Sequence, residues 1–450
     1  MRIVSEQQPR PRVHFTPRQG WINDPNGLIY LTGQYHLFAQ HYPHDTSWGA
    51  MHWLHATSDD LIHWHEQPIA LYPNERGMKF SGSSVLDRGN RSGLSTDGRD
   101  PLILVYTNHG QQEEQAIAWS TDGLAFTEWE KNPIIPNPGL HDFRDPKVFQ
   151  MPGSGHWHLV LTAGQQLFFY QSADLLHWHQ TGTFVPDGQP SGSEGKNWVL
   201  ECPDCFAVPA PDGRVVWVLL LSHMVLDEPR KTEILYWLGE FDGLTFRPFP
   251  SSSGPFLFDP GPDHYAPVTF AGLPEPLTLG WGSNWAYKDT LPCQTYCGQM
   301  TLARRLALIK TKNGLRLTQE PVLPTGLLPA KPDVMPGQLD VTIEFYGSFS
   351  CRLFNASGES FVISLDDNQY WQIDRSHGAS QPFWPSGLPD WYEVIRSPRL
   401  ADGPSQMRLV YDQTSIEIFA DQGLLACHLL VMPGKAFDQL EMAGAARVQH

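Results

Sequence analysis

The stretch Ser58-Asp-Asp-Leu-Ile-His-Trp64 recurs along the chain and decides the fold. Similar stretches are Ser120-Thr-Asp-Gly-Leu-Ala-Phe-Thr-Glu-Trp129 and Ser172-Ala-Asp-Leu-Leu-His-Trp178, with a weaker copy in Gly239-Glu-Phe-Asp-Gly-Leu-Thr-Phe246. The three full copies follow short apolar or alternating segments typical of β-strands. Units of roughly fifty to seventy residues that each hold several strands are typical of β-propeller blades. About five such blades fit between residues 10 and 315.

The chain changes character beyond this repeat region. Leu323-Pro-Thr-Gly-Leu-Leu-Pro-Ala-Lys-Pro332 is typical of a linker, and the alternating segments after it, such as Phe361 to Leu365 and Met407 to Tyr411, indicate a β-sandwich. The composition agrees, because 39 Gly and 39 Pro suit many short strands joined by tight turns. We therefore predict an all-β protein with a five-bladed propeller at 1–315, a linker at 316–335 and a β-sandwich at 336–450.

Charge and hydropathy exclude several kinds of partner. The formal net charge is −17 and no run of Lys or Arg stands out, so a nucleic acid would be repelled. No segment approaches the length of a membrane span, and residues 1–20 lack the apolar core of a signal peptide. We expect a cytoplasmic protein with neither a nucleic acid nor a membrane as its partner. The sequence leaves its oligomeric state open.

The six cysteines are too sparse for a disulfide scaffold in a chain of 450 residues, and we expect them to be reduced. Cys202 and Cys205 have the spacing of metal ligands, and so, loosely, do Cys293 and Cys297, which leaves a zinc site as a lesser alternative.

Three acids stand out as candidates for chemistry. Asp24 lies in Trp21-Ile-Asn-Asp-Pro-Asn-Gly27 and Asp145 in Phe143-Arg-Asp-Pro146. The proline after each aspartate biases it toward an extended backbone, so we expect both at the edges of strands. Arg144 should keep Asp145 ionised. Glu201 follows the apolar run Trp198-Val-Leu, a setting that favours a protonated carboxyl. Two carboxyls in unequal environments are what glycoside hydrolysis requires.

At these residues the chain resembles glycoside hydrolase family 32, the β-fructosidases that include invertases, fructan hydrolases and sucrose-6-phosphate hydrolases. The segment 21–27 is similar to the family's nucleophile motif, 143–146 to its transition-state motif and 201–203 to its acid/base motif. The resemblance covers nearly the whole length. It implies a five-bladed propeller followed by a β-sandwich, which the repeat and the strand alternation predict independently.

The resemblance also implies a reaction. The enzyme would be a retaining glycoside hydrolase that releases terminal non-reducing β-D-fructofuranosyl residues from sucrose or short fructans by double displacement. Asp24 would be the nucleophile, Glu201 the general acid/base and Asp145 the stabiliser of the transition state. The partner would be a small saccharide, and the resemblance implies neither a metal nor a cofactor. The implied substrate-binding residues are Asn23, Gln40, Trp48, Phe80, Ser83, Arg144, Cys202, Tyr265 and Trp285.

Two alternatives stay open at this point. A related five-bladed hydrolase that acts on arabinofuranosides or xylosides also uses three acids, but normally lacks the full Trp21 to Gly27 run. A sugar-binding propeller without catalysis is the other alternative, and it would be expected to have lost one of the acids. The preference among sucrose, sucrose-6-phosphate, inulin and levan, and the balance between hydrolysis and fructosyl transfer, cannot be predicted from the sequence.

Overall fold

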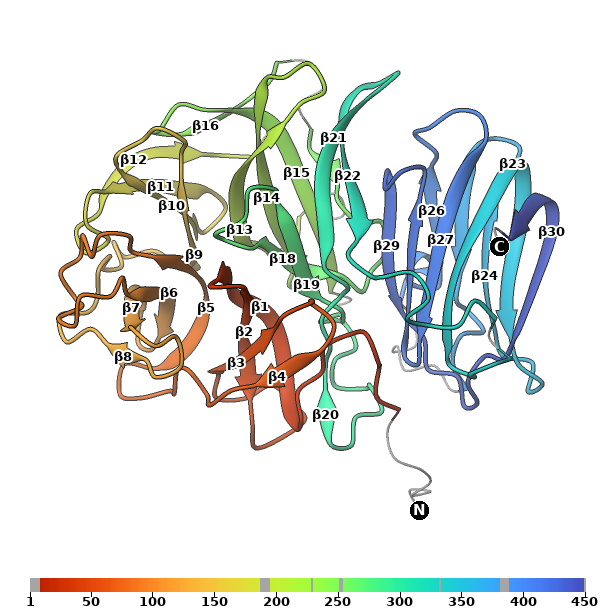
Figure 1. Cartoon of the computed structure of the whole chain (residues 1–450), viewed down its shortest axis with the longest axis horizontal. Coiled ribbons are helices and arrows are strands. Elements are labelled where there is room, and N and C mark those ends of the chain that lie inside the picture. Colours follow the sequence, from red (N-terminus) through yellow and green to blue (C-terminus); the bar gives the residue numbers. More distant parts are fainter. Residues whose placement is uncertain are drawn as a thin grey trace.

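The computed structural model describes residues 9–448 except 187–194, 228, 229, 251–253, 332 and 381–387. Within these residues almost all regular structure is β, and the exception is one 3-10 turn, η1 (Asp390–Tyr392). No helix in this part of the chain has the length and apolarity needed to cross a membrane. Figure 1 shows a ring of sheets coloured red to green beside a blue β-rich domain, so the predicted propeller and sandwich are confirmed.

The described part of the propeller holds five sheets with four main strands each, in chain order; β20 (Tyr296–Cys297) adds a fifth strand to the first sheet and β17 (Phe256–Leu257) a fifth strand to the fourth. The first blade is β1 (Gly20–Leu31), β2 (Gln34–Tyr42), β3 (His52–Ser58) and β4 (Trp64–Glu66). The second is β5 (Met78–Leu86), β6 (Leu102–His109), β7 (Glu113–Ser120) and β8 (Thr127–Glu128), and the third is β9 (Phe143–Gln150), β10 (Trp157–Ala163), β11 (Leu167–Ser172) and β12 (His179–Phe184). The fourth is β13 (Trp198–Pro209), β14 (Val215–Val225), β15 (Lys231–Phe241) and β16 (Phe246–Pro248), with β17 beside β15, and the fifth is β18 (Tyr265–Thr269), β19 (Leu277–Trp281), β21 (Arg304–Thr311) and β22 (Gly314–Pro321). The first strand of each blade lies innermost, where it contacts the first strands of its neighbours.

The repeated stretch forms the turn between the third and fourth strands of a blade. In the first copy the Ser58 hydroxyl accepts the Leu61 N–H at 2.9 Å, and Asp60 Oδ1 accepts the N–H groups of Ile62 and His63. The same bonds recur around Ser120 and Ser172. The residue after the aspartate has a positive φ in all three copies. Serine and aspartate favour this turn because their side chains replace missing backbone hydrogen bonds.

The ring closes through contacts of β1 with the chain of the last blade. The Tyr30 N–H donates to the Ala271 carbonyl and the Ala271 N–H to the Leu28 carbonyl, both at 2.9 Å. The short strand β20, which lies between β19 and β21 in the chain, adds to the other end of β1 in parallel. The four main strands of each blade therefore come from one contiguous length of chain, and β20 alone joins the sheet of another blade among the described residues.

The C-terminal domain is built around one long bent strand, β23 (Gln338–Phe354). Its first half pairs with β27 and its second half with β24, across a break between Phe345 and Phe349. The two resulting faces enclose one apolar core. The other strands are β24 (Ser360–Leu365), β25 (Tyr370–Asp374), β26 (Val394–Pro398), β27 (Ser405–Asp412), β28 (Ser415–Ala420), β29 (Leu425–Leu430) and β30 (Gln439–Val448).

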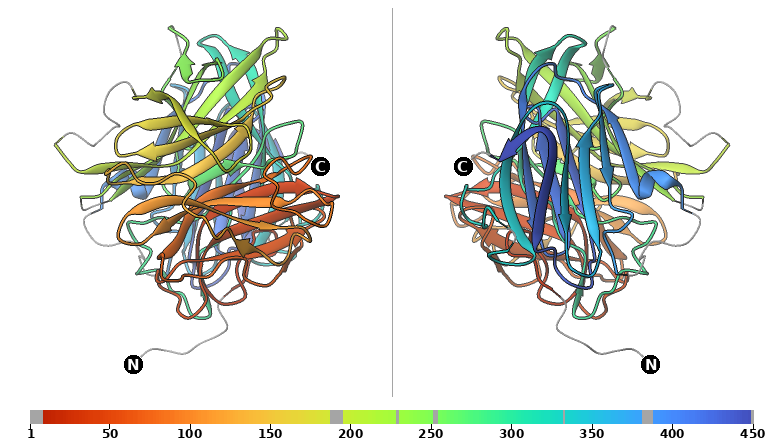
Figure 2. Two further views of the ribbon diagram at one scale, coloured as in Figure 1. Left: turned by 90° about the vertical axis from the view of Figure 1, so that its left-hand side faces the viewer. Right: turned by 90° about the vertical axis from the view of Figure 1, so that its right-hand side faces the viewer.

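The boundary between the domains differs from the expected one. Strand β22 continues the last blade to Pro321, beyond residue 315, where we placed the start of the linker. The connecting segment then runs over 322–337, before β23. Figure 1 shows the blue domain beside the propeller, and in the right-hand view of Figure 2 it lies in front of the propeller.

Buried charges join the two domains. The Asp412 carboxylate accepts the N–H groups of Arg12, Val13 and His14, and its Oδ2 lies 2.9 Å from His14 Nδ1. The other ring nitrogen of His14 lies 3.1 Å from Glu417 Oε1. Burial disfavours a charged imidazole, but the two carboxylates outweigh it and raise the pKa of His14 to about 9. The N-terminal segment is thus bound to the sandwich through an imidazolium.

Candidate active site

All five inner strands lose their regular pairing where they line one end of the central channel. The irregularities lie at Ile22/Pro25 in β1, Phe80/Gly82 in β5, opposite Arg144 to Lys147 in β9, at Glu201/Asp204 in β13 and at Tyr265/Val268 in β18. A β-bulge bends the strand and redirects a side chain. The bulges thereby turn acids from different blades toward one cavity.

The bulges also correct the expectation that both aspartates lie in extended backbone at strand edges. Asp24 lies within β1, the inner strand of the first blade. Asp145 has a φ of 62°, in the left-handed region, although a proline follows it. Cys202 also has a positive φ, of 47°. Such backbone strain is concentrated at functional sites.

A pocket of about 1000 Å³ lies at this end of the channel. It contains most of the residues expected from the sequence, which are Asn23, Asp24, Gln40, Trp48, Phe80, Arg144, Asp145, Glu201 and Trp285. Trp48 is 38% exposed at this pocket, so its ring is accessible to a ligand. An aromatic face beside clustered carboxyls suits a sugar ring and its hydroxyls.

Asp24 is held by a neighbouring blade. The Ser81 hydroxyl on β5 donates to Asp24 Oδ2 at 2.7 Å. The other oxygen, Oδ1, is buried and has no hydrogen-bond partner among the described residues. Burial, reinforced by the charge of Glu201, raises the pKa of Asp24 to about 6. The carboxylate is therefore ionised at neutral pH but poorly solvated, a condition that favours attack on an electrophile.

Asp145 differs from the sequence expectation. Its Oδ2 accepts the backbone N–H of Cys202 at 2.9 Å. We expected Arg144 to keep this acid ionised, but burial outweighs that charge, and Glu201 and Asp24 add repulsion, so the pKa of Asp145 rises to about 8. The sequence did not reveal this because the desolvation comes from other blades.

Glu201 has a donor on each carboxyl oxygen. Arg144 Nη2 donates to Oε1 at 3.2 Å, and the Tyr265 hydroxyl donates to Oε2 at 2.7 Å. The Glu201 side chain is 18% exposed, so it keeps access to the pocket. Tyr265 was expected to line the pocket and instead lies buried behind the acid.

Cys202 was expected among the substrate-binding residues, but it is buried, and its thiol contacts two of the acids. Its Sγ lies 3.7 Å from both Asp24 Oδ2 and Asp145 Oδ2. Burial, together with these negative charges, raises the pKa of the thiol well above its usual value. The thiol therefore keeps its single proton, which it can donate weakly to one or the other of these carboxyl groups.

Ser83 does not lie in the pocket, contrary to expectation. Its hydroxyl donates to the Pro146 carbonyl at 2.7 Å and accepts the Val148 N–H at 2.9 Å, so it joins two blades. Ser81, two residues earlier, takes the place beside Asp24. The bulge at Phe80/Gly82 decides which serine faces the cavity, and the sequence does not show it.

The pocket is also lined by residues that the sequence did not single out. They include His109, Glu113, His141, Asp142, Arg230 and Lys288. His109 ends β6 and Glu113 begins β7, while the other four lie outside the strands. None belongs to a motif of its own, so no signal in the sequence indicated them.

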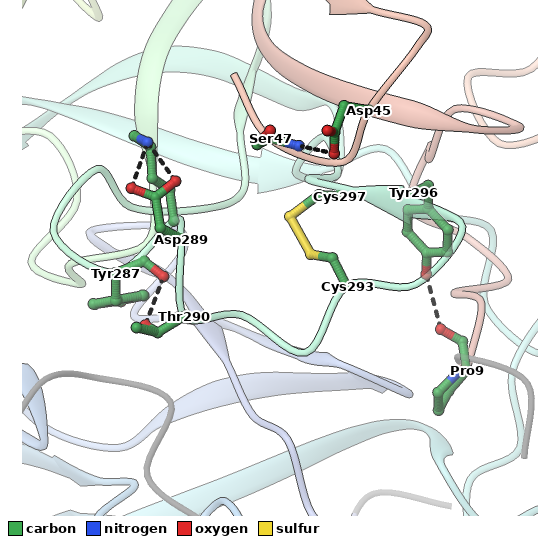
Figure 3. The surroundings of a disulfide bond; sticks show 10 residues. Pro9, Asp45, Ser47, Tyr287, Asp289, Thr290, Cys293, Tyr296 and Cys297 are labelled. Atoms are coloured by element: carbon green, nitrogen blue, oxygen red, sulfur yellow. Dashed lines mark hydrogen bonds and ion pairs between the residues drawn. A yellow bond between two sulfur atoms is a disulfide. The ribbon is translucent and has the colours of Figure 1, made fainter. Parts of the chain in front are cut away.

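The cysteines need one further correction. Cys293 and Cys297 form a disulfide, although we expected reduced thiols; the two Cα atoms lie 5.3 Å apart, close enough for the bond because the chain turns between them. Figure 3 shows this bond beside Tyr296 and the turn at Tyr287. Cys297 pairs with Trp21 of β1, and Lys288 lies over the Trp21 ring. The disulfide therefore anchors a segment of the pocket wall.

The zinc alternative at Cys202 and Cys205 receives no support. Among the described residues, the group of side chains close enough to hold a metal is His14, Glu417 and His428. It lies between the domains, where both nitrogens of His14 already face carboxylates.

Comparison with known proteins decides the family. A family model described as the N-terminal domain of glycosyl hydrolases family 32 matches residues 14–321, which is the propeller as the structure defines it. The chain belongs to glycosyl hydrolase family 32. As a family 32 protein, it is 34% identical to a levanase of Bacillus subtilis over 97% of this chain and 68% of the relative. It is 33% identical to invertase 2 of Saccharomyces cerevisiae over 88% of this chain and 76% of the relative.

A solved family 32 structure has the same architecture. The exo-inulinase of Aspergillus awamori superposes with a TM-score of 0.86 at 29% identity, over 98% of each chain. The agreement includes the second domain, which the family model does not cover.

Proposed function

We propose that this protein is a β-fructofuranosidase that removes terminal fructosyl units from sucrose and fructans with retention of configuration. The observation that carries the proposal is the convergence of Asp24, Asp145 and Glu201 in one pocket, joined by Cys202 and Arg144. The named activities of the relatives, levanase and invertase, support fructosides as substrates.

The contacts of the three acids support a division of labour. Ionised Asp24 would attack the anomeric carbon of the fructosyl unit, while protonated Glu201 gives its proton to the leaving oxygen. In the second step Glu201 would take a proton from water, which attacks the fructosyl-enzyme. Asp145 would bind fructose hydroxyls and stabilise the oxocarbenium-like transition state, and Arg144 would hold Glu201 in place.

The test is release of free fructose from sucrose, kestose, inulin and levan, with an arabinofuranoside in the same panel. Asp24→Asn should abolish release because it removes the nucleophile at almost constant volume. Asp100→Asn is the matched control, since Asp100 also precedes a proline but lies exposed and accepts the Gly89 N–H. Fructose release that survives in Asp24→Asn, or that occurs from none of the fructosides, would contradict the proposal.

We also propose, from the sequence, a cytoplasmic location. The Cys293–Cys297 disulfide counts against this location, because a reducing cytosol keeps most thiols reduced, so the redox state of the pair in cells is a direct test. Alkylation of both cysteines in freshly lysed cells would support the location, and a fully oxidised pair would contradict it.

A further inference from the structure

Glu113 lies outside the three motifs, yet both oxygens of its carboxylate have hydrogen-bond partners beside the pocket. It begins β7 and is 8% exposed. Its Oε2 accepts the Phe143 N–H at 2.7 Å, and its Oε1 accepts from Arg144 Nη1 at 3.1 Å. His109 Nδ1 lies 3.1 Å from the same Oε1. A buried carboxylate with three protein donors is fixed in position.

This arrangement gives the two Nη atoms of Arg144 different partners. Its Nη1 donates to Glu113 and to Asp142, the latter at 2.6 Å, and its Nη2 donates to Glu201. The guanidinium is planar and rigid, so a hold on Nη1 also sets the direction of Nη2. Glu113 therefore acts on Glu201 through Arg144.

His109 connects this carboxylate to the wall of the pocket. It faces Glu113 across the hairpin between β6 and β7. Its ring stacks on Phe80, with ring centres 4.1 Å apart and planes 11° apart. Because Phe80 lines the pocket, the hairpin cannot shift without moving both the pocket wall and Arg144.

The charges around this network define its electrostatic effect. Arg144 faces Glu113, Asp142, Asp145 and Glu201, and Glu113 faces Arg144 and His109. Although burial disfavours its charge, the His109 hydrogen bond and the Arg144 charge hold the pKa of Glu113 below its usual range. Glu113 is thus anionic at neutral pH and neutralises part of the positive charge that Arg144 presents to Glu201.

We propose that Glu113, held by His109, is a positioning residue that directs Arg144 toward Glu201 and sets the upper pH limit of the acid step. This rests on the proposed role of Glu201 as general acid. Without the Glu113 charge, Arg144 would stabilise ionised Glu201 more strongly, so Glu201 would lose its proton at a lower pH. The loss of one charge on the far side of a shared guanidinium shifts the titration of a carboxyl group by about one pH unit.

The experiment is the pH dependence of kcat/KM for sucrose hydrolysis by Glu113→Gln. We expect the basic limb to move down by about one pH unit, and the acid limb, which reports Asp24, to stay in place. Glu114→Gln is the matched control. It makes the same charge change one residue further along β7, where Glu114 pairs with Arg76, and it should leave the profile unchanged.

The outcomes separate the proposal from simpler explanations. A profile that is lower but not displaced would mean that Glu113 is only structural and would overturn the proposal. If Glu113→Gln does not fold, Glu113→Asp takes its place: the shorter acid should move the basic limb in the same direction by less, and an unmoved limb overturns the proposal. A wild-type enzyme that releases no fructose would instead refute the proposed function.

Discussion

The buried charge of Asp24 should cost the protein stability, and Asp24→Asn should recover it. The pKa of this acid is about 6 in the folded protein, against 3.8 for an unperturbed aspartate. The folded state therefore binds the proton more tightly than the unfolded state. Between pH 3.8 and 6 the folded wild type holds more protons than the unfolded chain, so stability falls as pH rises through this window.

The size of the effect follows from the shift. Each pH unit of difference is worth about 1.4 kcal/mol, so ionised Asp24 destabilises the fold by about 3 kcal/mol above pH 6. Asparagine cannot ionise and avoids this cost. With an unfolding entropy of about 2 cal/mol/K per residue, the gain corresponds to about 3 °C in Tm for a chain of this length.

Calorimetry of both proteins at pH 4 and pH 7.5 measures this effect. The two Tm values should nearly coincide at pH 4 and differ by about 3 °C at pH 7.5, with Asp24→Asn the more stable. Asp100→Asn serves again as the control and should show no such pH-dependent gain. A variant less stable than wild type at pH 7.5, or a gain of equal size at both pH values, would refute the reasoning.

Three further predictions concern catalysis and the domain contact. The kcat/KM for sucrose should fall below about pH 6, because protonated Asp24 cannot attack, and a profile flat down to pH 4.5 would contradict this. Tyr265→Phe should move the basic limb up by about half a pH unit, since it removes a donor that favours ionised Glu201; a downward shift would contradict that role. His14→Gln should cost about 3 kcal/mol of unfolding free energy below pH 6.5, where the imidazolium contributes fully because its folded pKa is raised to about 9. This cost should fade as the pH rises to 9. Urea unfolding of both proteins at pH 6 and pH 9.5 measures it, and an equal difference in unfolding free energy at the two pH values would contradict the prediction.

The parts of the fold that the sequence could predict are those set by neighbouring residues. The turns at Ser58, Ser120 and Ser172 are stabilised by hydrogen bonds between residues that lie within four positions of each other, so the same residue types recur wherever the turn does. Counting those turns was enough to predict the blades, and the alternation beyond residue 336 was enough to predict the second domain.

The parts that escaped prediction depend on residues far apart in the chain. The raised pKa of Asp145 comes from burial and from Glu201 and Asp24 on other blades. The bulge in β5 decides that Ser81, and not the expected Ser83, lies beside Asp24. The motif residues themselves were predictable only through the family resemblance, because nothing local requires Asp24 and Glu201 to meet.

The contiguous blades have a consequence for synthesis on the ribosome. The four main strands of each blade can pair as soon as they emerge, because the one strand that a blade takes from a later part of the chain is the two-residue β20, which joins the first sheet. Asp24 belongs to the first blade and Tyr265 to the last, so at typical elongation rates roughly 10 to 50 seconds separate their appearance. During that interval the ring is still open, so Asp24 and Glu201 are not yet held in one pocket, and the growing protein stays inactive until the ring closes.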